Sequence, residues 1–261
     1  MAKTIVVTSG KGGVGKTVAV SNIGVALAKL GKKVLLADID IGLRNLDLAV
    51  GLHDVIVYDI IDVIEGKCSL DKAIFKFEKY GHLHLLPAAQ STDKDFINPE
   101  SFSKLFNELD SQYDYIILDC PAGIEKGFKS AVAAADLAIV ALTPEMSSVR
   151  DADKVITLLE MANMSEIKIL INRVRVDMMM RGDMLSIDEI TDILGTSPIG
   201  IIEEDEIVIK SQKRNTMAVL ESSSTAGKQF YDVAKRIMGE NIPVLSLKGE
   251  RGFFKRLFGL Q

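Results

Sequence analysis

The chain has 261 residues, of which 48% are hydrophobic and 26% are charged, and its net charge is −5. This composition is typical of a globular protein with enough length for a large hydrophobic core, and the net negative charge argues against a chain built mainly to coat nucleic acid. No apolar run approaches the ~18 residues of a membrane-spanning helix, and residues 1–8 lack the regions of a signal peptide, so we expect a cytoplasmic protein. Cys68 and Cys120 form no metal-binding pair.

Apolar runs bounded by turn residues alternate along the chain with segments long enough for helices. The runs are apolar at consecutive positions, which is typical of strands in a sheet covered on both faces. We therefore predict an α/β fold, a single domain over residues 1–247 with a mostly parallel sheet and helices on both faces. The predicted strands are 4–7, 34–37, 83–86, 115–118, 137–142 and 167–171, and the clearest helices are 18–30, 151–161 and 225–238.

A glycine-rich loop follows the first predicted strand and opens the first predicted helix. It matches the phosphate-binding pattern G-x-x-x-x-G-K-[ST], known as the P-loop. The pattern binds phosphate when it lies between a buried strand and the N-terminus of a helix, as it does here. Glycines let backbone N–H groups surround phosphate oxygens, Lys16 would reach the β- and γ-phosphates, and the Thr17 hydroxyl would bind Mg²⁺. The predicted nucleotide-binding residues here are Gly10, Lys11, Gly12, Gly13, Val14, Gly15, Lys16, Thr17 and Val18.

Carboxylates follow two further predicted strands. Asp38 and Asp40 come directly after the run 34–37, and Asp119 follows the run 115–118 as in a Walker B strand. The carboxyl ends of parallel strands meet at one edge of a sheet, where ligands bind. Beside a triphosphate, such carboxylates can hold Mg²⁺ or orient the attacking water. We expect Thr17, Asp38 and Asp119 to form the magnesium site.

The loop and these carboxylates resemble a known family. A second lysine, Lys11, opens Lys-Gly-Gly-Val-Gly-Lys-Thr, residues 38–47 read Asp-Ile-Asp-Ile-Gly-Leu-Arg-Asn-Leu-Asp, and residues 120–125 read Cys-Pro-Ala-Gly-Ile-Glu. Together they resemble the deviant Walker A ATPases, and the likeness covers essentially the whole chain. The resemblance implies a homodimer formed on ATP binding, in which Lys11 reaches the partner's phosphates. It makes Lys11, Lys16 and Asp40 the catalytic residues.

Asn172 ends the predicted strand 167–171 and precedes Arg173-Val174-Arg175. A GTP-specific site would read Asn-Lys-x-Asp, whereas here Arg175 stands in place of the guanine-binding carboxylate, which favours ATP. The resemblance implies that Asn172 hydrogen-bonds the adenine. The alternative is a polar residue that caps a turn at the end of a strand.

The acidic residues Asp151 and Asp153 have both a structural and a functional interpretation. Asp151 and Asp153 would place negative charge on the first turn of a helix, while the resemblance implies that this surface binds regulators.

Members of the family usually carry proline before the acidic pair Glu204-Asp205, and this chain has Glu203 there. We expect this departure to loosen the wall of the base pocket without affecting the phosphate chemistry.

Residues 248–261 form a basic, amphipathic C-terminal segment. At ~100° per residue, the aromatic and aliphatic side chains separate from the basic ones, as in a helix that lies in a membrane interface and binds anionic lipids. The alternative is a helix that docks its phenylalanines on the domain. One such segment would bind a membrane weakly, and two on a dimer ~10²–10⁴ times more tightly. The expected membrane-binding residues are Phe253, Phe254, Lys255, Arg256, Leu257 and Phe258.

The resemblance implies a function for the whole chain. It implies an Mg²⁺-dependent ATPase on the inner face of the cell membrane that helps to place the division site, recruits a division inhibitor and is released when a second regulator stimulates hydrolysis. A flagellar-number regulator and a DNA-binding partition ATPase of the ParA type are the alternatives. The acidic charge and the C-terminal segment argue against DNA, and the start of the chain at the first strand disfavours the flagellar regulator. A P-loop that only holds nucleotide, without turnover, is a further alternative.

Overall fold

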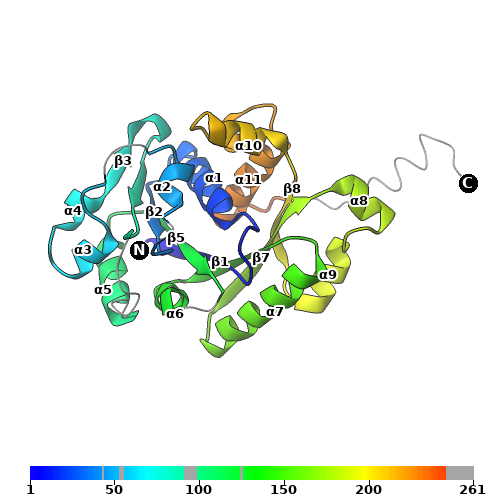
Figure 1. The fold of residues 1–261 in the computed structure, drawn as a ribbon, viewed down its shortest axis with the longest axis horizontal. Coiled ribbons are helices and arrows are strands. Elements are labelled where there is room, and N and C mark those ends of the chain that lie inside the picture. The colour runs from blue at the N-terminus through cyan, green and yellow to red at the C-terminus, as the bar shows by residue number, and fades with distance from the viewer. Residues whose placement is uncertain (43, 53–55, 91–98, 124–125, 245–261) are drawn as a thin grey trace, which may run out of the picture.

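The computed structural model describes residues 1–42, 44–52, 56–90, 99–123 and 126–244. An eight-stranded sheet runs through its centre in the order β3-β4-β2-β5-β1-β6-β7-β8 (Figure 1). Neighbouring strands are parallel, except for the antiparallel edge pair β3 and β4. The strands are β1 (Lys3–Ser9), β2 (Val34–Asp38), β3 (Phe75–Phe77), β4 (Leu83–Leu86), β5 (Tyr115–Ala122), β6 (Leu137–Leu142), β7 (Glu166–Val174) and β8 (Pro198–Glu203).

Helices connect the strands and cover both faces of the sheet. Figure 1 places α1, α10 and α11 on one side and α5, α6 and α7 on the other. The α-helices are α1 (Lys16–Lys29), α2 (Leu46–Ala49), α3 (Ile60–Ile64), α4 (Leu70–Ala73), α5 (Pro99–Leu109), α6 (Lys126–Ala133), α7 (Met146–Met161), α8 (Val176–Arg181), α9 (Ile187–Leu194), α10 (Glu206–Lys213) and α11 (Thr225–Ile237), and 3₁₀ turns lie at η1 (Glu78–Tyr80) and η3 (Ala218–Leu220).

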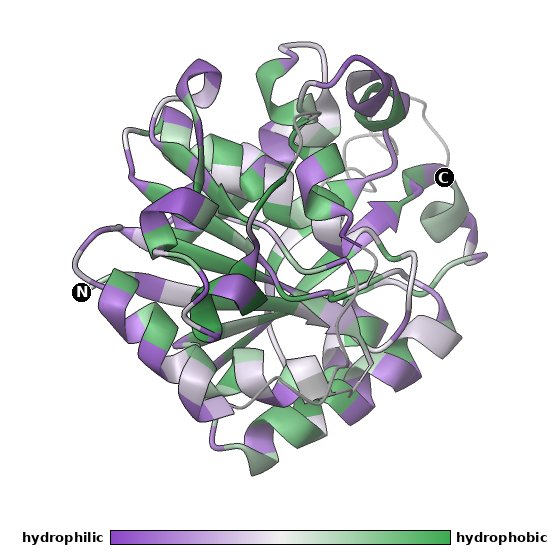
Figure 2. Ribbon diagram, turned by 60° about the vertical axis from the view of Figure 1, so that its left-hand side comes forward, coloured by the Kyte–Doolittle hydropathy of each residue, from purple (hydrophilic) through white to green (hydrophobic). Residues whose placement is uncertain are grey.

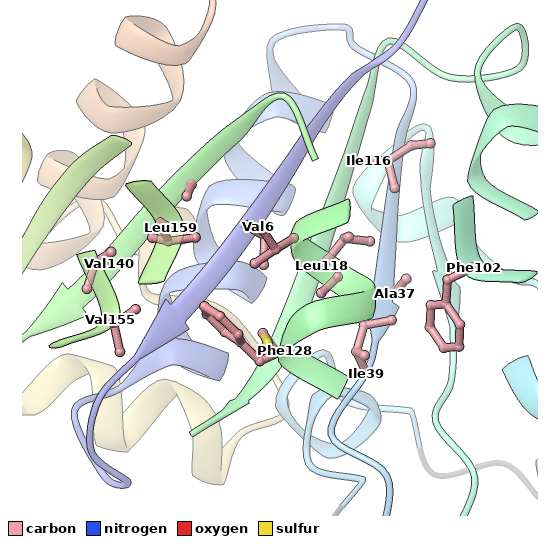
Figure 3. Packing of buried hydrophobic residues seen from close by; sticks show 14 of the residues in the cluster. Val6, Ala37, Ile39, Phe102, Ile116, Leu118, Phe128, Val140, Val155 and Leu159 are labelled. Atoms are coloured by element: carbon pink, nitrogen blue, oxygen red, sulfur yellow. The ribbon is translucent and has the colours of Figure 1, made fainter. Parts of the chain in front are cut away.

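Each central strand contributes to two hydrophobic cores. In β1, Val6 packs on one face of the sheet while Ile5 and Val7 pack on the other, and all three are fully buried. Figure 3 shows Val6 and Leu118 from neighbouring strands, with Phe128 of α6 in the same cluster. Figure 2 shows the apolar strands at the centre, with helices around them that carry both apolar and polar residues. Burial on both faces explains why the strands are apolar at consecutive positions.

The predicted α/β fold and all six predicted strands are confirmed. The start of α7 differs from the prediction, because the helix begins at Met146 and has no acidic residue in its first turn. Asp151 and Asp153 therefore lie further along the helix. The polar residues before them belong to the helix, and the Ser148 hydroxyl accepts a hydrogen bond from the Thr143 N–H at 3.0 Å.

The C-terminal segment 248–261, predicted to be an amphipathic helix, lies outside the described residues. Among the helices that the structure describes, none has the length and apolar character needed to cross a bilayer. The last described residue is Val244, which packs against the hydrophobic core on one face of the sheet. The boundary between the domain and the C-terminal segment therefore stays a prediction.

Candidate nucleotide-binding site

The predicted P-loop lines a cleft of about 800 Å³ at the carboxyl ends of the strands. Gly13 and Gly15 have φ angles of 81° and 92°, a conformation that glycine adopts without strain. Gly15 also has no room for a side chain, since a β-carbon there would lie 2.4 Å from the Asn172 Nδ2. The sequence pattern thus reflects two physical needs, a left-handed backbone and close packing. Lys16 is nearly buried, with 9% of its surface exposed, and it lines the cleft beside Thr17.

The three predicted strand-end carboxylates meet beside this loop. Asp38 and Asp119 lie opposite each other on the neighbouring strands β2 and β5, and Asp40 lines the cleft. The carboxylate of Asp38 accepts hydrogen bonds from the backbone N–H of Asp40 at 2.9 Å and of Leu46 at 3.2 Å. Asp38 therefore fixes the loop that carries Asp40.

An ion pair further along this loop supports the same arrangement. Arg44 has a left-handed backbone with φ of 44°, and its N–H donates to the Asp40 carbonyl at 3.3 Å. Its guanidinium Nε donates to the Asp47 carboxylate at 2.7 Å, and both side chains are largely buried. A buried pair of this kind holds a loop in one geometry because breaking it leaves an unpaired charge.

Burial strongly perturbs the two opposed carboxyl groups. It raises the pKa of Asp119 to about 6, against the lowering effects of the Thr17 hydroxyl and the Lys16 charge. Burial, and then the charge of Asp119, raises the pKa of Asp38 well above its usual value. Perturbed titratable groups in a cleft are typical of functional sites.

The donors in this part of the cleft fit a magnesium ion. The Asp119 Oδ1 is buried and has no hydrogen-bond partner among the described residues, while the Thr17 hydroxyl bonds to the same carboxylate. The described His, Cys, Asp and Glu residues form no cluster of three that could hold a metal alone. The unpaired Oδ1 and the adjacent hydroxyl suit Mg²⁺, which usually takes one or two carboxylates and completes its shell with water and phosphate oxygens.

Lys11 lies on the rim of the cleft rather than inside it. Its Nζ donates to the Ser147 hydroxyl at the start of α7, at 3.4 Å. Gly10, directly before it, lies against α7, since a β-carbon there would be 2.3 Å from the Asp151 carbonyl oxygen. The predicted partner-binding residues Asp151 and Asp153 lie on that helix, so the P-loop contacts the helix that carries them.

Comparisons with known proteins agree with this site. The family described as "AAA domain" matches residues 2–172. The septum site-determining protein MinD of Synechocystis sp. is 50% identical over 246 residues, which span 94% of this chain and 92% of the relative. The chain belongs to the MinD family. Its role is therefore that of a septum site-determining protein, a P-loop nucleoside triphosphatase of the MinD/ParA type.

Solved structures of the MinD family share this fold. The MinC:MinD cell division protein complex of Aquifex aeolicus superposes with a TM-score of 0.85 and 47% identity, over 94% of this chain and 99% of that chain. MinD complexed with Mg-ADP from Pyrococcus horikoshii gives a TM-score of 0.81 and 27% identity, over 93% and 100% of the two chains. The flagellar and partition alternatives have less support than the MinD family.

The family resemblance placed Asn172 at the adenine, and the structure gives its side chain a contact within the protein. Asn172 is buried, and its Nδ2 donates to the Val14 carbonyl of the P-loop at 2.7 Å. Its neighbour Arg173, with φ of 56°, lines the cleft. Asn172 thus braces the P-loop from β7, and its contact with the base stays a prediction.

Glu203 does not lie on the cleft wall. It ends β8, where its N–H donates to the Gln229 Oε1 at 2.7 Å and its carboxylate accepts from the Gln229 Nε2 at 2.8 Å. Proline could not donate the first of these bonds. The departure from the family pattern therefore ties β8 to α11 and does not loosen the described wall of the cleft.

Several lining residues were absent from the predicted site. Gln212 and Asn215 come from the end of α10 and the turn after it, far along the chain from the P-loop. Asn215 is left-handed with φ of 55°, and Gly51 packs closely on its carbonyl group. Their positions depend on how α10 packs, which no local pattern reveals. The remaining lining residues that sequence reasoning missed are Ile41, Asn45, Leu48, Ala49, Pro121, Ala122 and Arg173.

Proposed function

We propose that this protein hydrolyses ATP in the P-loop cleft with Mg²⁺ and, as an ATP-bound homodimer, binds the inner face of the cell membrane to direct placement of the division site. The observation that carries the proposal is the buried Asp119 carboxylate, unpaired at Oδ1, beside Lys16 and Thr17 in a MinD-family fold. Bound Mg²⁺ would neutralise charge on the β- and γ-phosphates.

The other steps of nucleotide binding and hydrolysis are assigned to individual residues of the chain. Backbone N–H groups of the P-loop and the Lys16 ammonium group would bind the phosphates. Asp40, positioned by the bonds from the loop to Asp38, would orient the attacking water. Lys11 is on the rim, where its charge could reach the phosphates of a second copy and act as an arginine finger does. Asn172 would contact the adenine from its place beside the P-loop.

The partners follow from the family. A MinC-like division inhibitor would bind the dimer, a pairing supported by the MinC:MinD complex of the Aquifex aeolicus relative. A MinE-like regulator would stimulate hydrolysis and release the protein from the membrane. Asp151 and Asp153 on α7 are the candidate contact residues for these regulators, and anionic lipids would bind residues 253–258. Nucleic acid is not an expected partner.

The experiment that tests the enzymatic part is phosphate release from ATP. We expect turnover in the presence of Mg²⁺ and its loss with a chelator. Lys16→Ala should abolish turnover, whereas Lys29→Ala, an exposed substitution in the last turn of α1, should not change it. Equal turnover of wild-type protein and Lys16→Ala would contradict the proposal and favour a P-loop that only holds nucleotide.

A further inference from the structure

A second cleft lies on the side of the molecule formed by α7, α8 and α9. We call it the methionine cleft, since four of the ten methionines of the chain line it. Its volume is about 710 Å³, and the described residues that line it are not shared with the nucleotide cleft. The lining residues that matter here are Glu145, Met146, Met179, Met180, Asp183 and Met184.

Two methionines present apolar surface to solvent within a cleft that is otherwise lined largely by polar groups. Met146 is 44% exposed and Met180 is 40% exposed, while Met179 beneath them is buried in the core. Methionine side chains are unbranched and polarisable, so they adapt to irregular apolar partners and make favourable contacts with aromatic rings. A methionine-lined surface of this kind suits a segment that carries phenylalanines.

The rim of the cleft is acidic. Glu145, Asp183 and Glu189 lie around it, and Arg181 is the one basic residue among its described lining residues. Arg181 is already paired, with the Asp183 carboxylate at 2.9 Å and the Asp177 carboxylate at 3.4 Å. This pair also neutralises Asp183, so Glu145 and Glu189 are the acidic rim residues that would attract a basic occupant.

We propose that the C-terminal segment of the same chain, residues 253–258, docks in the methionine cleft when the protein is not on a membrane. The segment carries Phe253, Phe254 and Phe258 for the methionines and Lys255 and Arg256 for the acidic rim. Its composition thus matches the cleft in both apolar character and charge.

The chain leaves the body within reach of the cleft. Arg236 holds the end of the described chain against β8, since its guanidinium donates to the carbonyls of Ile199, Ile242 and Pro243 at 2.7–2.9 Å. Val244 then packs against the hydrophobic core on one face of the sheet, which extends as far as Met179 of the cleft floor. From Val244 to Phe253, about nine extended residues can span ~30 Å, while the helix α9 beside the cleft is only ~12 Å long.

Docking and membrane binding would use the same apolar face of the segment. In the proposed function, which this consequence assumes, the cleft competes with the membrane and holds a single copy off the lipid surface. Two segments on a dimer gain effective concentration at the membrane that the cleft does not match. Docking therefore increases the difference in membrane affinity between the monomer and the dimer. The docking itself does not depend on this consequence.

The test is the rate of tryptic cleavage after Arg251, Lys255 and Arg256 in the full chain, without nucleotide or lipid, followed by mass spectrometry. Met180→Asp places a charge in the apolar wall and should accelerate this cleavage about five- to ten-fold, because only the undocked segment is cut. Met161→Asp is the matched control. Met161 is 74% exposed at the far end of α7 and lies outside the cleft, so the rate should not change.

A tail variant keeps the test independent of the folding of the body. Phe254→Ser should accelerate cleavage as Met180→Asp does, and the two changes together should add nothing further, since both abolish one contact. Wild-type rates in both single variants would overturn the proposal. Protection that grows with protein concentration would also overturn it, because a second copy would then be the occupant. If wild-type protein with ATP failed to bind liposomes while the differences in cleavage rate remained, the proposed function would be contradicted. The docking proposal would not be affected.

Discussion

Asp38 and Asp119 lie opposite each other on neighbouring parallel strands, and both carboxyl groups are almost completely buried. Burial raises the pKa of each, and the charge of Asp119 raises the pKa of Asp38 further. Without a cation, the ionised pair destabilises the folded chain. In the proposed function, a bound Mg²⁺ would reduce this cost by neutralising the buried charge.

Asp119→Asn should stabilise the metal-free protein at neutral pH. The folded pKa of Asp119 is about 6, above its ordinary value of 3.8, so the folded state holds a proton that the unfolded state has lost between these values. Stability from this group is therefore lost as pH rises towards about 6. Asparagine removes the penalty, which is on the order of 3 kcal/mol above pH 7.

Urea unfolding of both proteins at pH 7.5 and pH 5.0, without nucleotide or metal, measures this effect. The advantage of Asp119→Asn should shrink to about half at pH 5.0, where the native carboxyl group is mostly protonated. An advantage that is the same at both pH values would mean that it arises from packing rather than from the charge.

Lys11→Ala should separate nucleotide binding from dimerisation. Lys11 contacts the Ser147 hydroxyl on the rim of its own cleft, and Lys16 remains to bind phosphate. We expect ATP affinity within about ten-fold of wild type, and no ATP-dependent dimer in size-exclusion chromatography. Lys29→Ala is the control with the same change of charge on an exposed helix position. A full dimer of Lys11→Ala with ATP would contradict the role of this lysine across the interface.

Asp40→Ala should slow hydrolysis and prolong residence on the membrane. Asp40 lines the cleft, while its backbone N–H, which alanine retains, donates to Asp38. Removing a group that orients the attacking water typically lowers the rate ~10²–10⁴-fold. Phosphate release and liposome dissociation report the two effects, and Asp71→Ala on the exposed surface of α4 controls for charge. Unchanged turnover would remove Asp40 from the mechanism.

Gln229→Ala should destabilise the fold without weakening ATP binding. Gln229 is 5% exposed and makes two hydrogen bonds with Glu203, one of them to the backbone N–H at the end of β8. Leaving the partly buried Glu203 N–H unpaired costs up to ~1–3 kcal/mol. Urea unfolding measures the loss, with exposed Lys228→Ala as the control. A ten-fold weaker affinity for ATP would instead indicate that Glu203 contributes to the wall of the base pocket.

The sequence predicted the central sheet because burial on both faces forces consecutive apolar residues, as in Ile5, Val6 and Val7 of β1. It did not predict β3, which has three residues and is defined by its antiparallel pairing with β4. The P-loop could also be predicted from the sequence, since its pattern is contiguous and lies between a strand and a helix, although the close packing of Gly10 and Gly15 on Asp151 and Asn172 could not.

The parts of the site that were missed come from packing at long range. Gln212 and Asn215 reach the cleft from α10, and the Asn172 side chain braces Val14 across more than half of the chain. Nothing in the spacing of Gln212 and Asn215 distinguishes them from other polar residues at the ends of helices. Asn172 was predicted as a site residue from its place after a strand, but its contact with Val14 was not. Their roles depend on the tertiary arrangement of β7, α10 and the P-loop.

Liposome co-sedimentation with ATP, ADP or no nucleotide tests the central claim most directly, because it joins the P-loop to the C-terminal segment. With vesicles that contain anionic lipid, we predict sedimentation with ATP, little with ADP or without nucleotide, and none after deletion of residues 250–261, with ATP binding intact. Sedimentation that is independent of nucleotide, or that persists after the deletion, would contradict the account.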